Sequence, residues 1–190
     1  LFLVCLPRAS KEGKELKQEI NISEQLFGAL AAFTKPFFFE AAVPYVGEEI
    51  HFYVAVPDYL GEALNRQIQS LWNDAQVEPV DDYNIFNYTG VALGVFLKQK
   101  ERFILPIRTY QELNADTFLP ILGGLAKINE VGEGGVVQLI VRPAPSSFKK
   151  QIRSALSVLK KGWKLKDVLT HPLTVSWSDF TKVLSAKDNK

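Results

Sequence analysis

The chain has 190 residues, of which 47% are hydrophobic and 23% are charged. This balance is typical of a folded protein with one or two domains, and it excludes a disordered chain. The single cysteine, Cys5, excludes an intrachain disulfide framework and favours a reducing compartment. Because Cys5 lies in the apolar run LFLVCL, we expect it to be a small buried side chain.

The net charge of +1 conceals an uneven distribution along the chain. Residues 1–141 contain 11 Lys and Arg against 18 Asp and Glu, which gives −7, and residues 142–190 contain 11 against 3, which gives +8. An acidic body with a basic C-terminal part is informative about binding partners rather than about the fold. The chain lacks methionine and opens on an apolar strand, so we expect an internal piece of a longer, cytoplasmic protein.

Hydrophobic periodicity predicts six elements in the first half of the chain. Side chains alternate in the expected strands, and apolar residues recur every three to four positions in the expected helices. A capping pattern of Asn21 with Glu24 predicts a helix start. In chain order we expect a strand over residues 1–7, a helix from Asn21, strands over 37–43 and 50–56, a helix over 60–75 and a short strand in AQVEPVDDY. This β-α-β-β-α-β order predicts a ferredoxin-like unit over residues 1–89.

The second half repeats features of the first at an offset of 85 residues. Both Val46–Pro57 and Val131–Pro143 read Val-Gly-Glu, a short spacer, an apolar strand and proline, and a helix containing QIQS or QIRS follows each. We therefore expect α+β architecture with two tandem ferredoxin-like units, antiparallel sheets and helices on one face. The second unit, residues 90–166, is a looser copy, and residues 167–190 form a tail of undetermined role. A single sheet shared by both units is the alternative.

A hairpin and a glycine-containing helix are expected at the start of the second unit. The segment VALGVFLKQKERFILPI predicts a hairpin with its tip at residues 99–101. The helix that follows contains Gly123 and Gly124, each of which weakens a helix by roughly 1 kcal/mol.

The glycine-rich stretch EVGEGGVV at residues 130–137 is the one segment that suggests nucleotide chemistry. It lacks the lysine of a Walker A loop, and it precedes a strand, whereas phosphate-binding loops precede a helix. The repeat favours a turn instead, with Gly132 as the counterpart of Gly47. Neither histidine, His51 or His171, has metal-ligand spacing. We predict no catalytic residue, no cofactor and no metal.

Paired acids and strand aromatics each allow two interpretations. Glu48–Glu49 and Asp81–Asp82 flank turns, which favours solvated surface over acid–base chemistry. Aromatic residues in PFFFE and HFYVAV resemble a base-stacking platform, but the RNA-recognition signature is absent. Alternation places Phe52 on the face of Ile50, Val54 and Val56, so we favour a core position for Phe52.

A basic helix after Pro143 is the best candidate for a functional surface. Its apolar side chains are Phe148, Ile152, Leu156 and Leu159. Its candidate interaction residues are Lys149, Lys150, Arg153, Lys160, Lys161 and Lys164. Clustered lysines bind phosphates, acidic protein surfaces or anionic lipid. The alternative is the solvated side of an amphipathic helix.

Five segments together resemble one protein group: GEEIHFYVAVP, QIQSLWNDAQVE, DYNIF, ILPIRTYQEL and GEGGVVQLIVRPAP. They are similar to the region before the motor domain in bacterial conjugative-transfer, type IV secretion-like ATPases of the HerA and coupling-protein type. The resemblance covers roughly residues 1–160 and rests on structural rather than catalytic motifs. It implies an accessory domain that lies between a membrane-associated part and an ATP-hydrolysing motor.

These observations predict a non-enzymatic module that acts through protein–protein contact or self-association, in a parent protein that is membrane-anchored. No small-molecule substrate is expected. A nucleic-acid-binding module that uses the basic helix is the alternative.

Overall fold

The computed structural model describes residues 1–6, 16–47, 49–109, 112, 116–128 and 130–170. They fall into two compact units, which the chain connects more than once. The first unit comprises Leu1–Val95 and Arg108–Pro143, and the second comprises Phe96–Ile107 and Ala144–Lys190.

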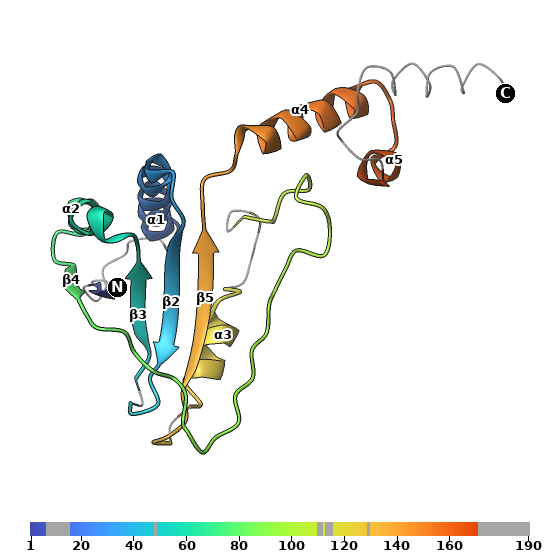
Figure 1. The fold of residues 1–190 in the computed structure, drawn as a ribbon. Helices are drawn as coiled ribbons and strands as arrows, with labels where there is room; N and C mark the ends of the chain where they lie inside the picture. The colour runs from blue at the N-terminus through green and yellow to red at the C-terminus, as the bar shows by residue number, and fades with distance from the viewer. Residues whose placement is uncertain (7–15, 48, 110–111, 113–115, 129, 171–190) are drawn as a thin grey trace. The chain divides into compact units, whose positions relative to one another are not determined.

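The first unit is an antiparallel sheet with helices (Figure 1). Its first half follows the predicted β-α-β-β-α-β order, and the strand order in the sheet is β4-β1-β3-β2-β5. The elements are β1 (Phe2–Cys5), α1 (Leu16–Leu30), the 3-10 turn η1 (Ala31–Phe33), β2 (Phe37–Val43), β3 (His51–Ala55), η2 (Asp58–Leu60), α2 (Gly61–Leu71), β4 (Gln76–Pro79), α3 (Leu119–Leu125) and β5 (Gly135–Val141).

The second predicted ferredoxin-like unit is not confirmed. In the described part of residues 90–166 there is one strand, β5, and it joins the first sheet by pairing antiparallel with β2, from Phe37 opposite Val141 to Val43 opposite Gly135. The alternative of one shared sheet is therefore the arrangement that forms. The predicted hairpin is wrong, because residues 91–99 are extended without a ladder partner. No other strand from the described part of residues 90–166 lies beside β5, so the backbone N–H and C=O groups of β5 pair with those of β2.

One face of the sheet carries the apolar core. Odd-numbered residues of β2 point toward the helices, so Phe37 packs with residues of α1 and α2. Ala41 and Val43 pack with Leu125 of α3 in a second cluster. The fully buried Leu30 and Leu64 come from α1 and α2. The three described helices of this unit, α1, α2 and α3, therefore cover the same sheet face.

The first helix differs from the prediction at its start. It begins at Leu16, so Asn21 lies inside the helix and the predicted cap is wrong. Good helix formers in LKQE extend the helix toward the N-terminus and outweigh the capping pattern at Asn21. At the other end η1 stops at Thr34, whose φ of 57° is left-handed, and Pro36 follows.

The described part of the second unit contains two helices and a loop. Helix α4 (Ser146–Lys160) is followed by Gly162, at a φ of 88°, and then by α5 (Leu165–Thr170). The ring of Phe103 lies 4.4 Å from that of Phe148, centroid to centroid, and the Arg102 guanidinium donates a 2.7 Å hydrogen bond to the Leu169 carbonyl. These contacts hold residues 96–107 against the helices. Among the described residues, no helix is both long and apolar enough to cross a membrane.

Candidate functional site

The glycine-rich stretch forms a turn, as predicted. Gly132 has a φ of 104°, a conformation that side chains other than glycine rarely adopt, and β5 begins at Gly135. The Gly132 amide donates a 2.7 Å hydrogen bond to the Tyr45 carbonyl, so the two turns that the repeat relates are direct neighbours. A Cβ on Gly134 would lie 2.5 Å from the Ile85 carbonyl oxygen. The glycines therefore serve close backbone packing and lead into a strand.

A polar ladder crosses the sheet face opposite the helices, and we define it as Glu40, Tyr53, Tyr83 and Gln138. Glu40 on β2 lies opposite both Tyr53 of β3 and Gln138 of β5. The Tyr83 hydroxyl donates a 2.6 Å hydrogen bond to one carboxylate oxygen of Glu40, and the Gln138 amide donates a 2.6 Å bond to the other. The rings of Tyr53 and Tyr83 stack at 4.6 Å. The buried carboxylate is thus paired on both oxygens.

Burial is the main cause of the shifted titration of the two tyrosines. It raises the pKa of Tyr83 far above its usual value, and the hydrogen bond to Glu40 and the Glu40 charge raise it further. The pKa of Tyr53 is raised first by burial and then by the Glu40 charge. Both hydroxyls therefore stay protonated to a higher pH than an ordinary tyrosine does, and the Tyr83 hydroxyl donates to Glu40.

The polar ladder also fixes the segment that follows β4, which we call the strap and define as Val80–Asn87. Figure 1 shows it in green, running across the sheet from β4 toward the start of β5. Besides Tyr83, the strap is held by a 3.0 Å bond from the Tyr45 amide to the Asn84 carbonyl. The ladder is therefore a structural clamp, because its polar groups face one another.

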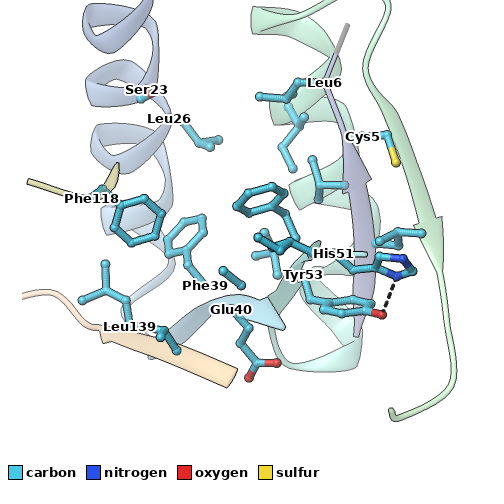
Figure 2. Close-up of a pocket in the computed structure, with 18 of the residues that line it drawn as sticks. Cys5, Leu6, Ser23, Leu26, Phe39, Glu40, His51, Tyr53, Phe118 and Leu139 are labelled. Atoms are coloured by element: carbon cyan, nitrogen blue, oxygen red, sulfur yellow. Dashed lines mark hydrogen bonds between the residues drawn. The ribbon is translucent and has the colours of Figure 1, made fainter. Parts of the chain in front are cut away.

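The helix-covered face is open over part of its area, where it forms an apolar groove of about 860 Å³ (Figure 2). Residues of β1, α1, β2, β3, α2 and β5 and the residue before α3 line it, including Leu26, Phe27, Phe39, Phe52, Phe118 and Leu139. Of the polar residues at this groove, Glu40 and Tyr53 belong to the opposite sheet face. The groove consequently offers apolar area and few converging polar groups.

Two predictions about single residues change at this groove. Phe52 does share a sheet face with Val54, as alternation indicates, but its side chain is 46% exposed at the groove instead of buried in the core. Cys5 is exposed, so the prediction of a buried thiol is wrong. The causes differ. The helices leave Phe52 uncovered on their own face of the sheet, whereas the pairing of Leu3 with Tyr53 places Cys5 on the opposite face.

The six predicted basic residues are all exposed in the second unit. Five of them lie on α4 or at its end, and Lys164 precedes α5. Of the predicted apolar side of this helix, Phe148 packs on Phe103, whereas Leu156 is exposed and Ala155 is buried. The helix is therefore seated about one position away from the predicted face. The structure brings these cations together on one element but does not test what they bind.

The remaining candidates are separate from one another. Asp81 and Asp82 are exposed, as the solvated interpretation predicts, and Glu49 is exposed near His51, whose ring nitrogen is 4.0 Å from its carboxylate. The other ring nitrogen of His51 is 3.1 Å from the Tyr53 hydroxyl. Glu48, His171 and the tail beyond residue 170 lie outside the described residues.

Sequence reasoning missed both the polar ladder and the groove. One signal was available for the ladder, because Glu40 is a lone acid inside the apolar strand FFFEAAV. A carboxylate at such a position needs partners, and buried polar groups nearly always have them. Comparison of the chain with protein-family models, with curated protein sequences and with solved structures gave no match.

Proposed function

We propose that this chain is a non-catalytic assembly module of a larger secretion or DNA-transfer ATPase, at the cytoplasmic face of a membrane-anchored parent protein, and that it mediates protein–protein contacts. The resemblance of its segments to the region before the motor of such ATPases is the basis for the parent. The observation that supports the contact role is the uncovered groove on the helix-covered face of the first unit.

The groove suits the apolar side chains of a protein partner. Phe27, Phe52 and Phe118 are each more than one third exposed along it, and aromatic residues are enriched where protein surfaces meet. Contiguous uncovered apolar surface commonly marks an interaction site. The polar groups that a small-molecule site uses to orient its ligand are few here. We therefore assign the groove to a protein segment of the same assembly.

The polar ladder supports the non-catalytic part of the proposal. Its carboxylate is buried and accepts one hydrogen bond on each oxygen, from Tyr83 and from Gln138, so little of it faces a substrate. A general base needs a free lone pair within reach of a substrate proton. The ladder therefore positions the strap and leaves contact surfaces as the functional feature of the first unit.

The test uses the whole reading frame that encodes these residues. We expect a nucleotide-binding motor in the same polypeptide. We also expect Phe27→Asp with Phe52→Asp to lower the oligomeric mass of that polypeptide by light scattering, with circular dichroism unchanged. Tyr59→Asp, at an exposed position outside the groove lining, is the matched control. A frame without a motor would overturn the ATPase assignment, and an unchanged mass would overturn the groove as an assembly surface.

A nucleic-acid-binding module is the second candidate, favoured by the charge of the second unit. That unit contains 13 Lys and Arg against 4 Asp and Glu, a net +9. Binding through phosphates weakens steeply with salt. Anisotropy titrations with single- and double-stranded DNA at about 50 mM salt test it, since no binding there would exclude the role. Loss of binding in Lys149→Glu with Lys160→Glu would support it.

We also propose that the two halves derive from one duplicated ferredoxin-like unit. The order α3-β5-α4 parallels α1-β3-α2, and the related turns at Tyr45 and Gly132 are hydrogen-bonded neighbours. An experimental structure in which residues 102–107 form a strand would support the duplication. An experimental structure in which β5 is still the one strand of the second half, as in the described residues here, would argue against it.

A further inference from the structure

An uncovered apolar segment follows the strap, and we call it the arm, Tyr88–Leu97. Six of the seven residues over 91–97 are apolar, and Gly94 is the exception. Val91, Leu93, Val95 and Leu97 are exposed, with Leu93 at 90%, and Tyr88 and Phe96 are fully exposed. A short apolar run without polar alternation is consistent with a strand that is buried on both faces. The arm thus has the pattern of a sheet strand without a sheet.

The backbone of the arm is equally unpartnered. Its root is fixed, because the Gly90 amide donates to the Asn87 carbonyl and the Thr89 amide to the Asn87 side chain. Beyond this root, no hydrogen bond joins residues 91–98 to any other residue in the described part of the chain. The exposed N–H and C=O groups of the arm are therefore available to pair with a free strand edge.

The sheet of the first unit offers such an edge at β5. Within the described residues β5 has one neighbour, β2, and its outer side is free. Its sequence GVVQLIV contains no charge and no proline, and Leu139 and Ile140 are more than half exposed. The opposite edge, β4, is short and contains Glu78 and Pro79, which are residues that discourage edge pairing. The long edge is thus the unprotected one.

We propose that the arm of one copy of this chain pairs with the β5 edge of a second copy. Each copy carries an unpaired apolar segment, the arm, and a sheet edge at β5 that has no neighbouring strand among the described residues. Val91–Leu97 and Gly135–Val141 are both seven residues long, so the ladder can run the full length of β5. Pairing also brings apolar side chains of the arm beside Leu139 at the groove.

Charge complementarity favours a second copy over an unrelated partner. The first unit contains 9 Lys and Arg against 17 Asp and Glu, a net −8, whereas the second unit has the net +9 given above. The arm leads directly into Lys98 and Lys100 of the second unit, and β5 belongs to the acidic first unit. Exchange of the arm therefore brings the basic unit of one copy to the acidic unit of the next, where opposite charges favour association.

The test is disulfide trapping with the full chain in a Cys5→Ser background, which removes the exposed native thiol. Single variants Val91→Cys, Leu93→Cys and Val95→Cys are each mixed with a size-tagged Leu139→Cys chain. The three arm positions cover alternative registers. We expect at least one pair to form a mixed dimer on a non-reducing gel, and we expect the control, a tagged Tyr59→Cys chain, to form none.

A second measurement tests the proposal without cysteines, in case the disulfide distorts the arm. We expect sedimentation velocity to show a self-associated species that Leu93→Asp abolishes and Tyr59→Asp retains, and that weakens with added salt. A monomer at all concentrations, or a Leu93→Cys/Leu139→Cys chain that closes on itself, would overturn the proposal. This inference rests on the proposed assembly function, but a monomer here together with a groove-dependent parent assembly would overturn the arm exchange alone.

Discussion

The two faces of the five-stranded sheet are stabilised by different chemistry. The helix-covered face is apolar, with Leu30, Phe37 and Leu64 buried beneath α1 and α2. The strap-covered face has a buried carboxylate at its centre, satisfied by Tyr83 and Gln138. Apolar burial is non-directional, and the part of this face that the helices leave uncovered forms the groove. The polar ladder depends on specific donors, so it fixes the position of one segment, the strap.

The two faces therefore have different roles: the apolar face supplies most of the folding free energy, and the polar ladder fixes the position of the strap. Loss of volume under the helices should cost folding free energy in proportion to the cavity that remains. Loss of a donor at the ladder should cost less, but it should release the strap and with it the root of the arm at Asn87. The following changes test that separation in order of expected effect.

The largest effect is expected from truncation in the apolar core. Leu64→Ala removes most of a side chain that is 0% exposed, and we expect it to lower the free energy of unfolding by about 3 kcal/mol. Leu119→Ala is the matched control, because that leucine is mainly exposed and should cost no more than about 0.5 kcal/mol. Urea unfolding followed by circular dichroism measures both. Equal costs would contradict the assignment of the core.

A smaller effect is expected at the polar ladder. Tyr83→Phe keeps the ring that stacks on Tyr53 but removes the hydroxyl that donates to Glu40. A buried carboxylate with one donor fewer should lower the free energy of unfolding by about 1–3 kcal/mol. Tyr88→Phe, at a fully exposed tyrosine, should be silent. Hydrogen exchange should also quicken at the Tyr45 amide, which bonds the strap at Asn84, and unchanged exchange would mean that the strap is held by other contacts.

The parts of this structure that the sequence predicts are those set by local pattern. The strand at residues 37–43 shows a periodicity of two and forms over those residues. The helix that follows Pro57 shows a periodicity of three to four and forms over Gly61–Leu71, so it ends four residues before the predicted end at residue 75. Long-range pairing is different, because Glu40 meets Tyr83 across 43 residues and Gln138 across 98. No local pattern encodes those partners. The groove is also invisible in the sequence, since Phe27 and Phe52 match the pattern of core residues and only the position of the helices leaves them uncovered.

The pH dependence of stability tests the ladder without relying on a single truncation. Below pH about 10 Tyr83 is protonated in both the folded and unfolded states and contributes no slope. Above it the unfolded tyrosine loses its proton while the raised pKa keeps the folded one protonated, so the free energy of unfolding falls as pH rises. Tyr83→Phe should make this alkaline decline shallower than in the native chain, and Tyr88→Phe should leave it unchanged. A decline that is identical in all three would contradict the raised pKa.

The smallest expected effects come from two glycines and have opposite signs. Gly132→Ala puts a Cβ at a φ of 104° in the turn beside Tyr45, so we expect it to lower the free energy of unfolding by about 1 kcal/mol. Gly28→Ala lies in α1, where a Cβ would meet nothing within 4 Å, and should raise it by roughly 0.5–1 kcal/mol. Thermal and urea unfolding of both variants measure the difference. Glycine to alanine is thus expected to stabilise helix α1 and to destabilise the turn that leads into β5. The backbone conformation at each glycine, rather than the buried area, decides the sign of the change in the free energy of unfolding.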